Sequence, residues 1–120
     1  MAIEHNGTLM RIYVAESNRS GGRDAHQVVV DALAAAGLAG AVVFKGIEGF
    51  GKRRVISSDR ALDAWTDLPV LIEVVDADDK IRGFVPILES ILDDGLVTLE
   101  RVQTIIYRTA GDVPGNHAHL

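Results

Sequence analysis

The sequence predicts an α+β domain in which strands and helices alternate in the order β-α-β-β-α-β. Four short segments rich in β-branched and aliphatic residues have the length of strands, and two longer segments repeat apolar residues at three- and four-residue spacing. Glycine and polar residues separate them. This order is typical of ferredoxin-like folds, so we expect a ferredoxin-like βαββαβ sandwich, with a four-stranded antiparallel sheet and two helices on one face.

The first strand is predicted over residues 9–15, where aliphatic and aromatic residues cluster. A polar connection with two glycines follows at 17–22. Apolar residues then recur on one helical face over 25–36, and Asp24 is placed to cap this helix or to stabilise its first turn by charge. Gly37 lies where a left-handed C-cap is expected, so the helix should end there.

The next apolar run, residues 41–44, is too short for a helix and predicts a buried second strand. Residues 46–59 have neither a strand nor a helix period. We therefore expect a long exposed loop, followed by a helical turn at 60–65.

The second half of the domain contains the clearest strand pattern, at residues 68–75, with a proline only near its start. Asp76 then offers an N-cap, and residues 81–92 show a second apolar helical face. Pro86 lies inside this helix and should bend it. Gly95 is expected to end the helix.

A last strand is predicted over residues 97–107. The expected organisation is a single domain at 8–109 and a flexible C-terminal tail at 110–120, where Gly, Pro and Asn are frequent. With 48% hydrophobic residues in 120, the chain can bury a sizeable core without disulfides.

Composition excludes several classes of protein. The absence of cysteine excludes disulfide frameworks, thiol nucleophiles and cysteine-ligated metal sites, and it suits a cytoplasmic protein. A net charge of −5 argues against a nucleic-acid binder. The apolar runs are far shorter than the ~20 residues that span a bilayer, and the N-terminus lacks the features of a signal peptide, so no direct membrane insertion is expected.

The predicted strand at 68–75 is apolar on both faces. Successive residues of a strand face opposite sides, and apolar residues occur at both odd and even positions: Leu71, Ile72, Val74 and Val75. Helices on one face would leave the other face of the sheet open. A homo-oligomer that buries this open face is the expected solution.

The side chains predict no catalytic centre. No nucleophile lies in a pattern with a base, so we expect that the protein is not an enzyme. Among the histidines, His5, His117 and His119 fall in expected tails and His26 in the first turn of a helix. Carboxylates as ligands for a metal are a weaker alternative, since anions at a helix start are explained by the helix dipole.

Residues 45–54 stand out because they hold four cations and one carboxylate, a net charge of +3 in an acidic protein. Glycines at 46, 49 and 51 would let backbone N–H groups approach an anion, which the adjacent cations would neutralise. The spacing is neither that of a Walker A loop nor that of a dinucleotide fingerprint. The alternative is a flexible surface loop that charge keeps soluble.

This loop resembles the start of the T-loop of PII signal-transduction proteins, through the sequence Glu-Gly-Phe-Gly-Lys at residues 48–52. Further similarities to PII proteins occur in order and spacing at 68–69, 72–75, 78–79, 94–95 and 108–109. Residues 11–14, 46–51, 67–70 and 95–99 together resemble more closely an uncharacterised PII-like family catalogued as domain of unknown function one hundred and ninety.

The resemblance implies a homotrimer of ferredoxin-like subunits that binds an adenine nucleotide, ATP, ADP or AMP, in a cleft between subunits. The T-loop, 47–59 here, would contact a regulated enzyme or a membrane transporter. Backbone donors would come from Gly49, Phe50 and Gly51, phosphate partners would be Lys52, Arg53 and Arg108, and Gly95 would allow close approach of the ligand.

Two departures limit this transfer. The lysine that follows aspartate-glycine in PII proteins is Leu96 here, and one of the two C-terminal arginines falls at Ile106. No tyrosine lies between Gly51 and Leu68, so we expect no uridylylation. The alternative function is a ligand-independent trimeric interaction module, whose basic loop docks an acidic or membrane-transporter partner.

Overall fold

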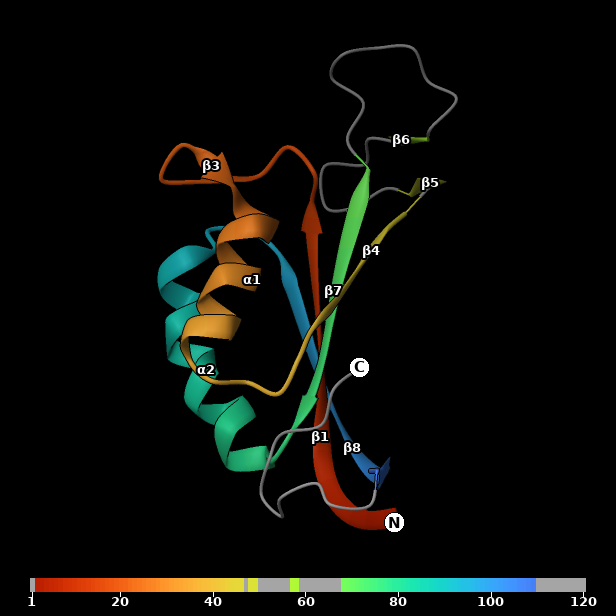
Figure 1. Cartoon of the computed structure of the whole chain (residues 1–120). Coiled ribbons are helices and arrows are strands. Elements are labelled where there is room, and N and C mark those ends of the chain that lie inside the picture. The colour runs from red at the N-terminus through yellow and green to blue at the C-terminus, as the bar shows by residue number, and fades with distance from the viewer. Residues whose placement is uncertain (1, 47, 50–56, 59–67, 110–120) are drawn as a thin grey trace.

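A computed structural model describes residues 2–46, 48–49, 57–58 and 68–109. Four strands form one antiparallel sheet in the order β4-β7-β1-β8, and Figure 1 shows both helices on one face of it. The sheet strands are β1 (Ala2–Ala15), β4 (Val42–Lys45), β7 (Pro69–Asp76) and β8 (Leu96–Tyr107), and the helices are α1 (Ala25–Ala35) and α2 (Asp78–Ile91). The prediction of an α+β, ferredoxin-like sandwich is confirmed.

Four further strands have two residues each. β2 (Arg19–Ser20) pairs with β3 (Arg23–Asp24) between β1 and α1, and β5 (Glu48–Gly49) pairs with β6 (Ser57–Ser58). The second pair lies within the expected loop, so this part of the chain returns on itself.

The hydrophobic core lies between the sheet and the two helices. It contains Met10, Ile12, Val14, Val29, Leu33, Val70, Ile72, Val74, Ile81, Phe84 and Leu88. In β1 and β7 these residues alternate with residues that face the other way, which is the period of a strand with one covered face. Burial of each such side chain contributes about 1.5–3 kcal/mol, so packing on this face fixes the register of both strands.

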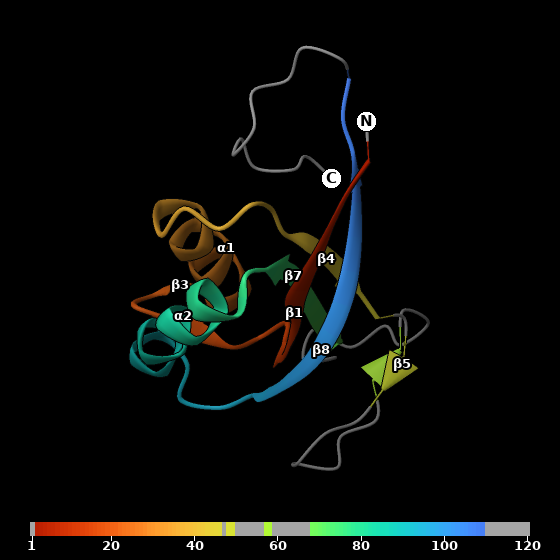
Figure 2. The same cartoon turned by 90° about the horizontal axis from the view of Figure 1, so that it is seen from below.

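Strand β1 is longer than predicted, because it begins at Ala2. Strand β7 ends at Asp76, opposite Thr8, and the first residues of β1 pair only with β8. We call this two-stranded extension, residues 2–7 with 102–107, the arm. In Figure 2 the paired ends of β1 and β8 run past the helices. The expectation that His5 lies in a tail was wrong, because His5 pairs with Thr104.

Helix α1 has the predicted position. Asp24 is its N-cap residue, but its side chain makes no capping hydrogen bond and instead pairs with Arg19 at 2.6 Å. At the other end Gly37 has φ 80°, Gly37 N–H donates to Ala34, and Leu38 N–H donates to Leu33. These two bonds form a Schellman motif, which explains why the helix ends at this glycine.

The prediction of a buried strand at 41–44 was wrong in its burial. Among the described strands β4 lies at the edge of the sheet and pairs with β7, and Val42, Val43 and Phe44 are 37%, 43% and 48% exposed. A short apolar run is typical of a fully buried strand, but here no described strand pairs with the outer edge of β4.

Helix α2 differs from the prediction at both ends. Its N-cap residue is Ala77 rather than Asp76. The carboxylate of Asp76 accepts hydrogen bonds from the backbone N–H groups of Ala77 and Ala39. The helix ends at Ile91 rather than at Gly95, and Pro86 lies inside it as predicted. Asp76 therefore joins the end of β7 to the connection that follows α1.

Three predictions lie outside the described residues: the helical turn at 60–65, the C-terminal tail at 110–120, and the positions of His117 and His119. In the described ranges neither helix has the length and hydropathy that a membrane span needs.

Candidate functional site

The face of the sheet opposite the helices carries an uncovered apolar band. Phe44, Leu71, Tyr13 and Leu96 stand opposite one another in adjacent strands and so share one face. Phe44 and Leu96 are 48% and 60% exposed. Leu71 and Val75 lie half-buried on this face, while Ile72 and Val74 are buried beneath the helices, so β7 is apolar on both faces as predicted.

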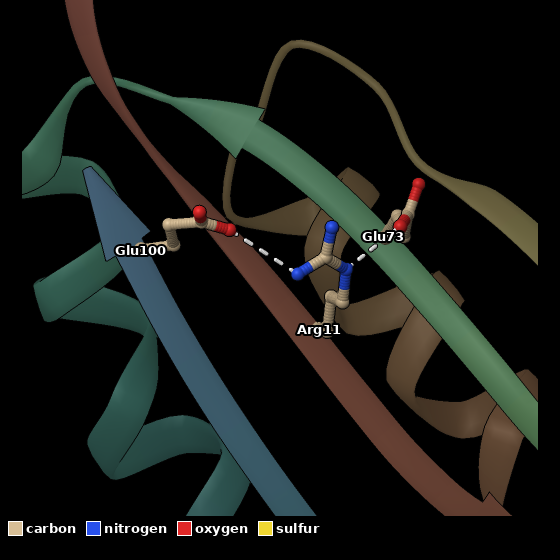
Figure 3. Close-up of polar contacts among 3 residues, drawn as sticks. All are labelled: Arg11, Glu73 and Glu100. Atoms are coloured by element: carbon tan, nitrogen blue, oxygen red, sulfur yellow. Dashed lines mark hydrogen bonds and ion pairs between the residues drawn. The ribbon is translucent and has the colours of Figure 1, made fainter. Parts of the chain in front are cut away.

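A charged cluster lies beside this band on the same face. Figure 3 shows Arg11 of β1 between Glu73 of β7 and Glu100 of β8. Its Nε lies 3.0 Å from Glu73 Oε2, and its Nη1 lies 3.3 Å from Glu100 Oε2. The hydrogen bond to Glu73, followed by the charges of both carboxylates, raises the pKa of Arg11, although desolvation opposes this. The open face is therefore apolar with one internally matched charge cluster.

The start of the 47–59 segment is fixed to the sheet. Gly46 N–H donates to the Pro69 carbonyl at 2.7 Å, and a Cβ on Gly46 would lie only 2.5 Å from Pro69 Cγ. Lys45 Nζ lies 2.7 Å from Glu16 Oε1. One of the four cations predicted for the basic loop therefore has a carboxylate partner at the loop base.

Gly95 lies in the turn between α2 and β8. Its φ is 158°, and an added Cβ would lie 3.0 Å from the Tyr13 carbonyl oxygen, so glycine allows the chain to pass close to β1. The side-chain amide of Asn18 donates to the Asp94 carbonyl at 3.0 Å and holds this turn against the connection after β1. The turn thus lies at the same end of the sheet as Gly46 and the short strand that contains Gly49.

A groove of about 270 Å³ adjoins this turn, and we call it the α2–β8 groove. Its apolar lining is Val85, Leu88, Leu92 and Val97. Beside Gly95 it is also lined by Glu89, Asp93 and Asp94, and no cation of the described residues lines it. A phosphate bound near Gly95 would meet these carboxylates, so it needs cations from elsewhere.

The structure separates two of the predicted site residues. Gly95 precedes β8 and Arg108 follows it, so the twelve residues of the strand place them about 40 Å apart. Gly49 and Gly95 belong to one end of the sheet and Arg108 to the other. The predicted site residues Phe50, Gly51, Lys52 and Arg53 lie outside the described residues.

A second cleft, of about 480 Å³, lies where α2 begins. It is lined by Asn6, Gly7, Thr8, Asp78, Arg101, Val102 and Gln103. Thr8 is buried, and its hydroxyl donates to Asp78 Oδ1 at 2.7 Å. This bond, followed by the charges of Arg82 and Arg101, lowers the pKa of Asp78 although desolvation opposes it. The charges around Asp78 are thus matched within the chain, which indicates a structural junction between α2 and β1.

Sequence reasoning missed two features of these sites: the Asn18 bridge and the Arg11 cluster. The cluster has a detectable pattern, because Arg11, Glu73 and Glu100 are charged residues inside predicted strands. Asn18 has no comparable pattern, since asparagine is ordinary in a turn. Over the described part of the chain no three metal-ligating side chains gather.

Comparison with known proteins places this geometry in a family. The profile of the DUF190 family, described as an uncharacterized ACR, matches residues 7–104. A UPF0166 protein of Aquifex aeolicus is 32% identical over 97 residues, which cover 81% of this chain and 91% of the relative. A UPF0166 protein of Methanocaldococcus jannaschii is 34% identical over 92 residues, with coverage of 76% and 84%.

The fold is similar to that of CPII, a nitrogen regulatory PII-like protein from Thiomonas intermedia K12. The structure of CPII bound to ADP, AMP and bicarbonate matches with a TM-score of 0.58 at 16% identity and covers 85% of this chain and 91% of CPII. The apo form matches with a TM-score of 0.53 at 16% identity, with coverage of 88% and 98%. The chain therefore belongs to the DUF190 family and has the fold of PII-like proteins.

Proposed function

We propose that this protein is a PII-like sensor that binds an adenine nucleotide or a related anion in a cleft between subunits. Occupancy of the cleft is signalled through the 47–59 segment to a protein partner, such as an enzyme or a membrane transporter. The nucleotide acts as a regulatory ligand, and no bond is made or broken.

Two comparisons support a nucleotide as the ligand. CPII shares the fold and binds ADP, with AMP and bicarbonate in one structure. The motifs at 48–52, 94–95 and 108–109 resemble the PII segments that meet the nucleotide. Gly49, Phe50, Gly51, Lys52, Arg53, Gly95 and Arg108 are the proposed binding residues.

The observation that carries the proposal is the separation of Gly95 from Arg108. At about 40 Å, the length of strand β8, one nucleotide cannot contact both residues of a single chain. A site that uses both must combine Gly95 of one subunit with Arg108 of another. An intersubunit cleft satisfies this requirement.

The charges near Gly95 support the same arrangement. The groove beside Gly95 carries Glu89, Asp93 and Asp94, and Leu96 stands where PII proteins have a lysine. Phosphate oxygens are bound by charge-assisted hydrogen bonds from guanidinium and ammonium groups. Lys52, Arg53 and the Arg108 of a neighbouring subunit would supply them.

The proposed assembly is a homotrimer. A sheet with helices on one face leaves the band of Phe44, Tyr13 and Leu96 exposed, and a contiguous apolar surface favours association. Three copies that turn this face inward would bury it and bring the ends of neighbouring sheets together.

A thermal-shift panel tests the proposal, with ATP, ADP, AMP, cyclic nucleotides, bicarbonate and phosphate, each with and without magnesium. A ligand at about one hundred times its Kd adds roughly 2.7 kcal/mol of stability, which raises the melting temperature by several degrees. We expect a selective shift with one adenine nucleotide and loss of that shift in Arg108→Ala. A flat response to the whole panel would contradict the sensor function and favour a ligand-independent docking module.

A further inference from the structure

The cleft of about 480 Å³ at the base of the arm combines polar side chains from three elements, and we call it the arm-base cleft. Asn6 and Thr8 come from β1, Arg101 and Gln103 from β8, and Asp78 from the first turn of α2. Thr8 stands opposite Arg101, and Asn6 stands opposite Gln103. Residues opposite one another in antiparallel strands share a face, so all four side chains lie on the face that α2 covers. Figure 1 shows this first turn of α2 at the end of the sheet where β1 and β8 continue past β7.

The carboxylate of Asp78 is held in place by one of its two oxygens. Thr8 Oγ1 donates to Asp78 Oδ1 at 2.7 Å, and Arg82 Nε lies 3.5 Å from the same oxygen. Within the described part of the chain Oδ2 has no partner, so this oxygen is available to accept a hydrogen bond from a ligand. The lowered pKa of Asp78 keeps the carboxylate ionised at neutral pH.

Arg101 lies near Asp78 without forming an ion pair with it. Its positive charge helps to lower the pKa of Asp78, yet among the ion pairs of the described residues the partner of Asp78 is Arg82 and Arg101 has none. A guanidinium stays charged at any working pH and offers two parallel donors to a carboxylate. The cleft therefore presents a cation and an anion that a ligand can bridge.

This pair of charges favours a zwitterionic ligand. Asp78 would repel a phosphate or a dicarboxylate, and the described residues that line the cleft include no aromatic ring on which a base or a sugar could stack. An α-amino acid carries a carboxylate for Arg101 and an ammonium group for Asp78. The side-chain amides of Asn6 and Gln103 add donors and acceptors for a polar side chain. A volume of about 480 Å³ lies within the usual range of small-molecule sites.

We propose that the arm-base cleft binds a free α-amino acid with a polar, uncharged side chain. The carboxylate of the ligand pairs with Arg101, its ammonium group donates to Asp78 Oδ2, and its side chain contacts the amides of Asn6 and Gln103.

This site is separate from the proposed nucleotide site. Arg101 lies six residues after Gly95 and seven before Arg108, so about 20 Å of strand separates it from each. The cleft also lies on the helix side of the sheet, whereas the proposed trimer buries the other face. The inference therefore does not depend on the proposed function.

Calorimetric titration of the full chain with the protein amino acids, one at a time, tests the inference. We expect a polar, uncharged amino acid to bind. Its N-acetyl derivative and its α-amide should each bind at least tenfold more weakly, because each lacks one of the two charges. If no amino acid binds, or if these derivatives bind as tightly as the parent, the inference is overturned.

Arg101→Gln should weaken binding of that amino acid at least tenfold, since the ligand carboxylate loses its guanidinium. Arg82→Gln is the matched control, because Arg82 is also a cation beside Asp78 but does not line the cleft. It should change the affinity less than twofold. Equal affinities of Arg101→Gln and the native protein would overturn the inference.

NMR signals of side-chain amides locate the bound amino acid. The signals of Asn6 and Gln103 should shift on saturation, whereas that of Asn18, beyond the other end of β1, should not. Shifts that leave Asn6 and Gln103 unaffected would contradict the site. Nucleotide binding is scored separately: amino-acid binding without a nucleotide response overturns the proposed function alone, and a nucleotide response without amino-acid binding overturns this inference alone.

Discussion

The side-chain amide of Asn18 donates a hydrogen bond to the main-chain carbonyl of Asp94 across 3.0 Å. The backbone of Asn18 also takes part, since its N–H donates to Ala15 and its carbonyl accepts from Ala25. One residue therefore connects the end of β1, the start of α1 and the turn that contains Gly95. This link positions the turn that the proposed nucleotide site uses.

Asn18→Ala should reduce the free energy of unfolding by about 1–2 kcal/mol, because a partly buried carbonyl loses its donor. Urea unfolding measures this change. Asn6→Ala is the control, since Asn6 is exposed on the arm and should change stability by less than about 0.5 kcal/mol. Equal stability of Asn18→Ala and the native protein would show that the link is unimportant.

Two glycines should respond in opposite directions to alanine. A Cβ on Gly46 would meet Pro69 at 2.5 Å, so Gly46→Ala should destabilise the loop base by about 1–3 kcal/mol. Gly83 lies inside α2 with open space around it, so Gly83→Ala should stabilise the protein by about 0.5–1 kcal/mol. The melting temperatures of the two variants check both predictions. A melting temperature of Gly46→Ala above that of the native protein would refute the close approach of Gly46 to Pro69.

Acid stability should depend on the Thr8–Asp78 hydrogen bond. This bond lowers the pKa of Asp78 below its ordinary value of 3.8, with help from Arg82 and Arg101. A carboxyl with a lowered folded-state pKa stabilises the fold above its ordinary pKa, and this contribution is lost as the pH falls through the lowered value.

Thr8→Val should therefore be less stable than the native protein at pH 7, and the difference should shrink as the pH falls below about 4. Thr8→Ser, which keeps the hydroxyl, should show the same dependence of the free energy of unfolding on pH as the native protein. If the free energies of unfolding of Thr8→Val and the native protein differed by the same amount from pH 7 to pH 2, the stability would not depend on the ionisation of Asp78 through Thr8.

The Arg11 cluster should control association through the open face. Arg11→Leu leaves Glu73 and Glu100 without their shared cation on a surface that the proposed trimer buries. We expect the dissociation constant of the assembly to rise at least tenfold in sedimentation equilibrium. Arg23→Leu removes an exposed ion pair with Asp31, remote from this face, and should leave association unchanged. Equal dissociation constants for Arg11→Leu and Arg23→Leu would show that the interface does not include the Arg11 cluster.

Element order could be predicted from the sequence because each helix and each core strand has a clear local pattern. The apolar face of α2 and the run at 68–75 are examples, and both elements occur where the pattern indicates. Helix α1 ends at Ala35, and Gly37 follows its C-cap residue with the positive φ that was expected of a left-handed C-cap.

Features that depend on distant partners could not be predicted. β1 extends back to Ala2 because β8 pairs with it, although residues 2–7 have no apolar alternation. β4 is exposed because its place at the sheet edge depends on topology. The carboxylate of Asp76 was expected to cap α2, but Ala39, far away in the sequence, is one of its partners.

The resemblance predicted the candidate site as a set of residues in a cleft between subunits, without a geometry. The motifs predict that Gly95 and Arg108 belong to the same site. They do not show that the two residues lie at opposite ends of β8. That separation is the reason why we propose a site shared between subunits.

Binding by mixed subunits tests the shared site most directly. Arg108→Ala and Gly95→Val should each lose binding of the adenine nucleotide that shifts the native protein, because each variant lacks one half of every site. Gly49→Val, at the same end of the sheet, replaces Gly95→Val if the latter does not fold. Mixing the two variants under conditions of subunit exchange should restore binding to about a quarter of the sites of a randomly assembled ring. Mixtures that bind no more nucleotide than the separate variants would contradict a site built from two subunits.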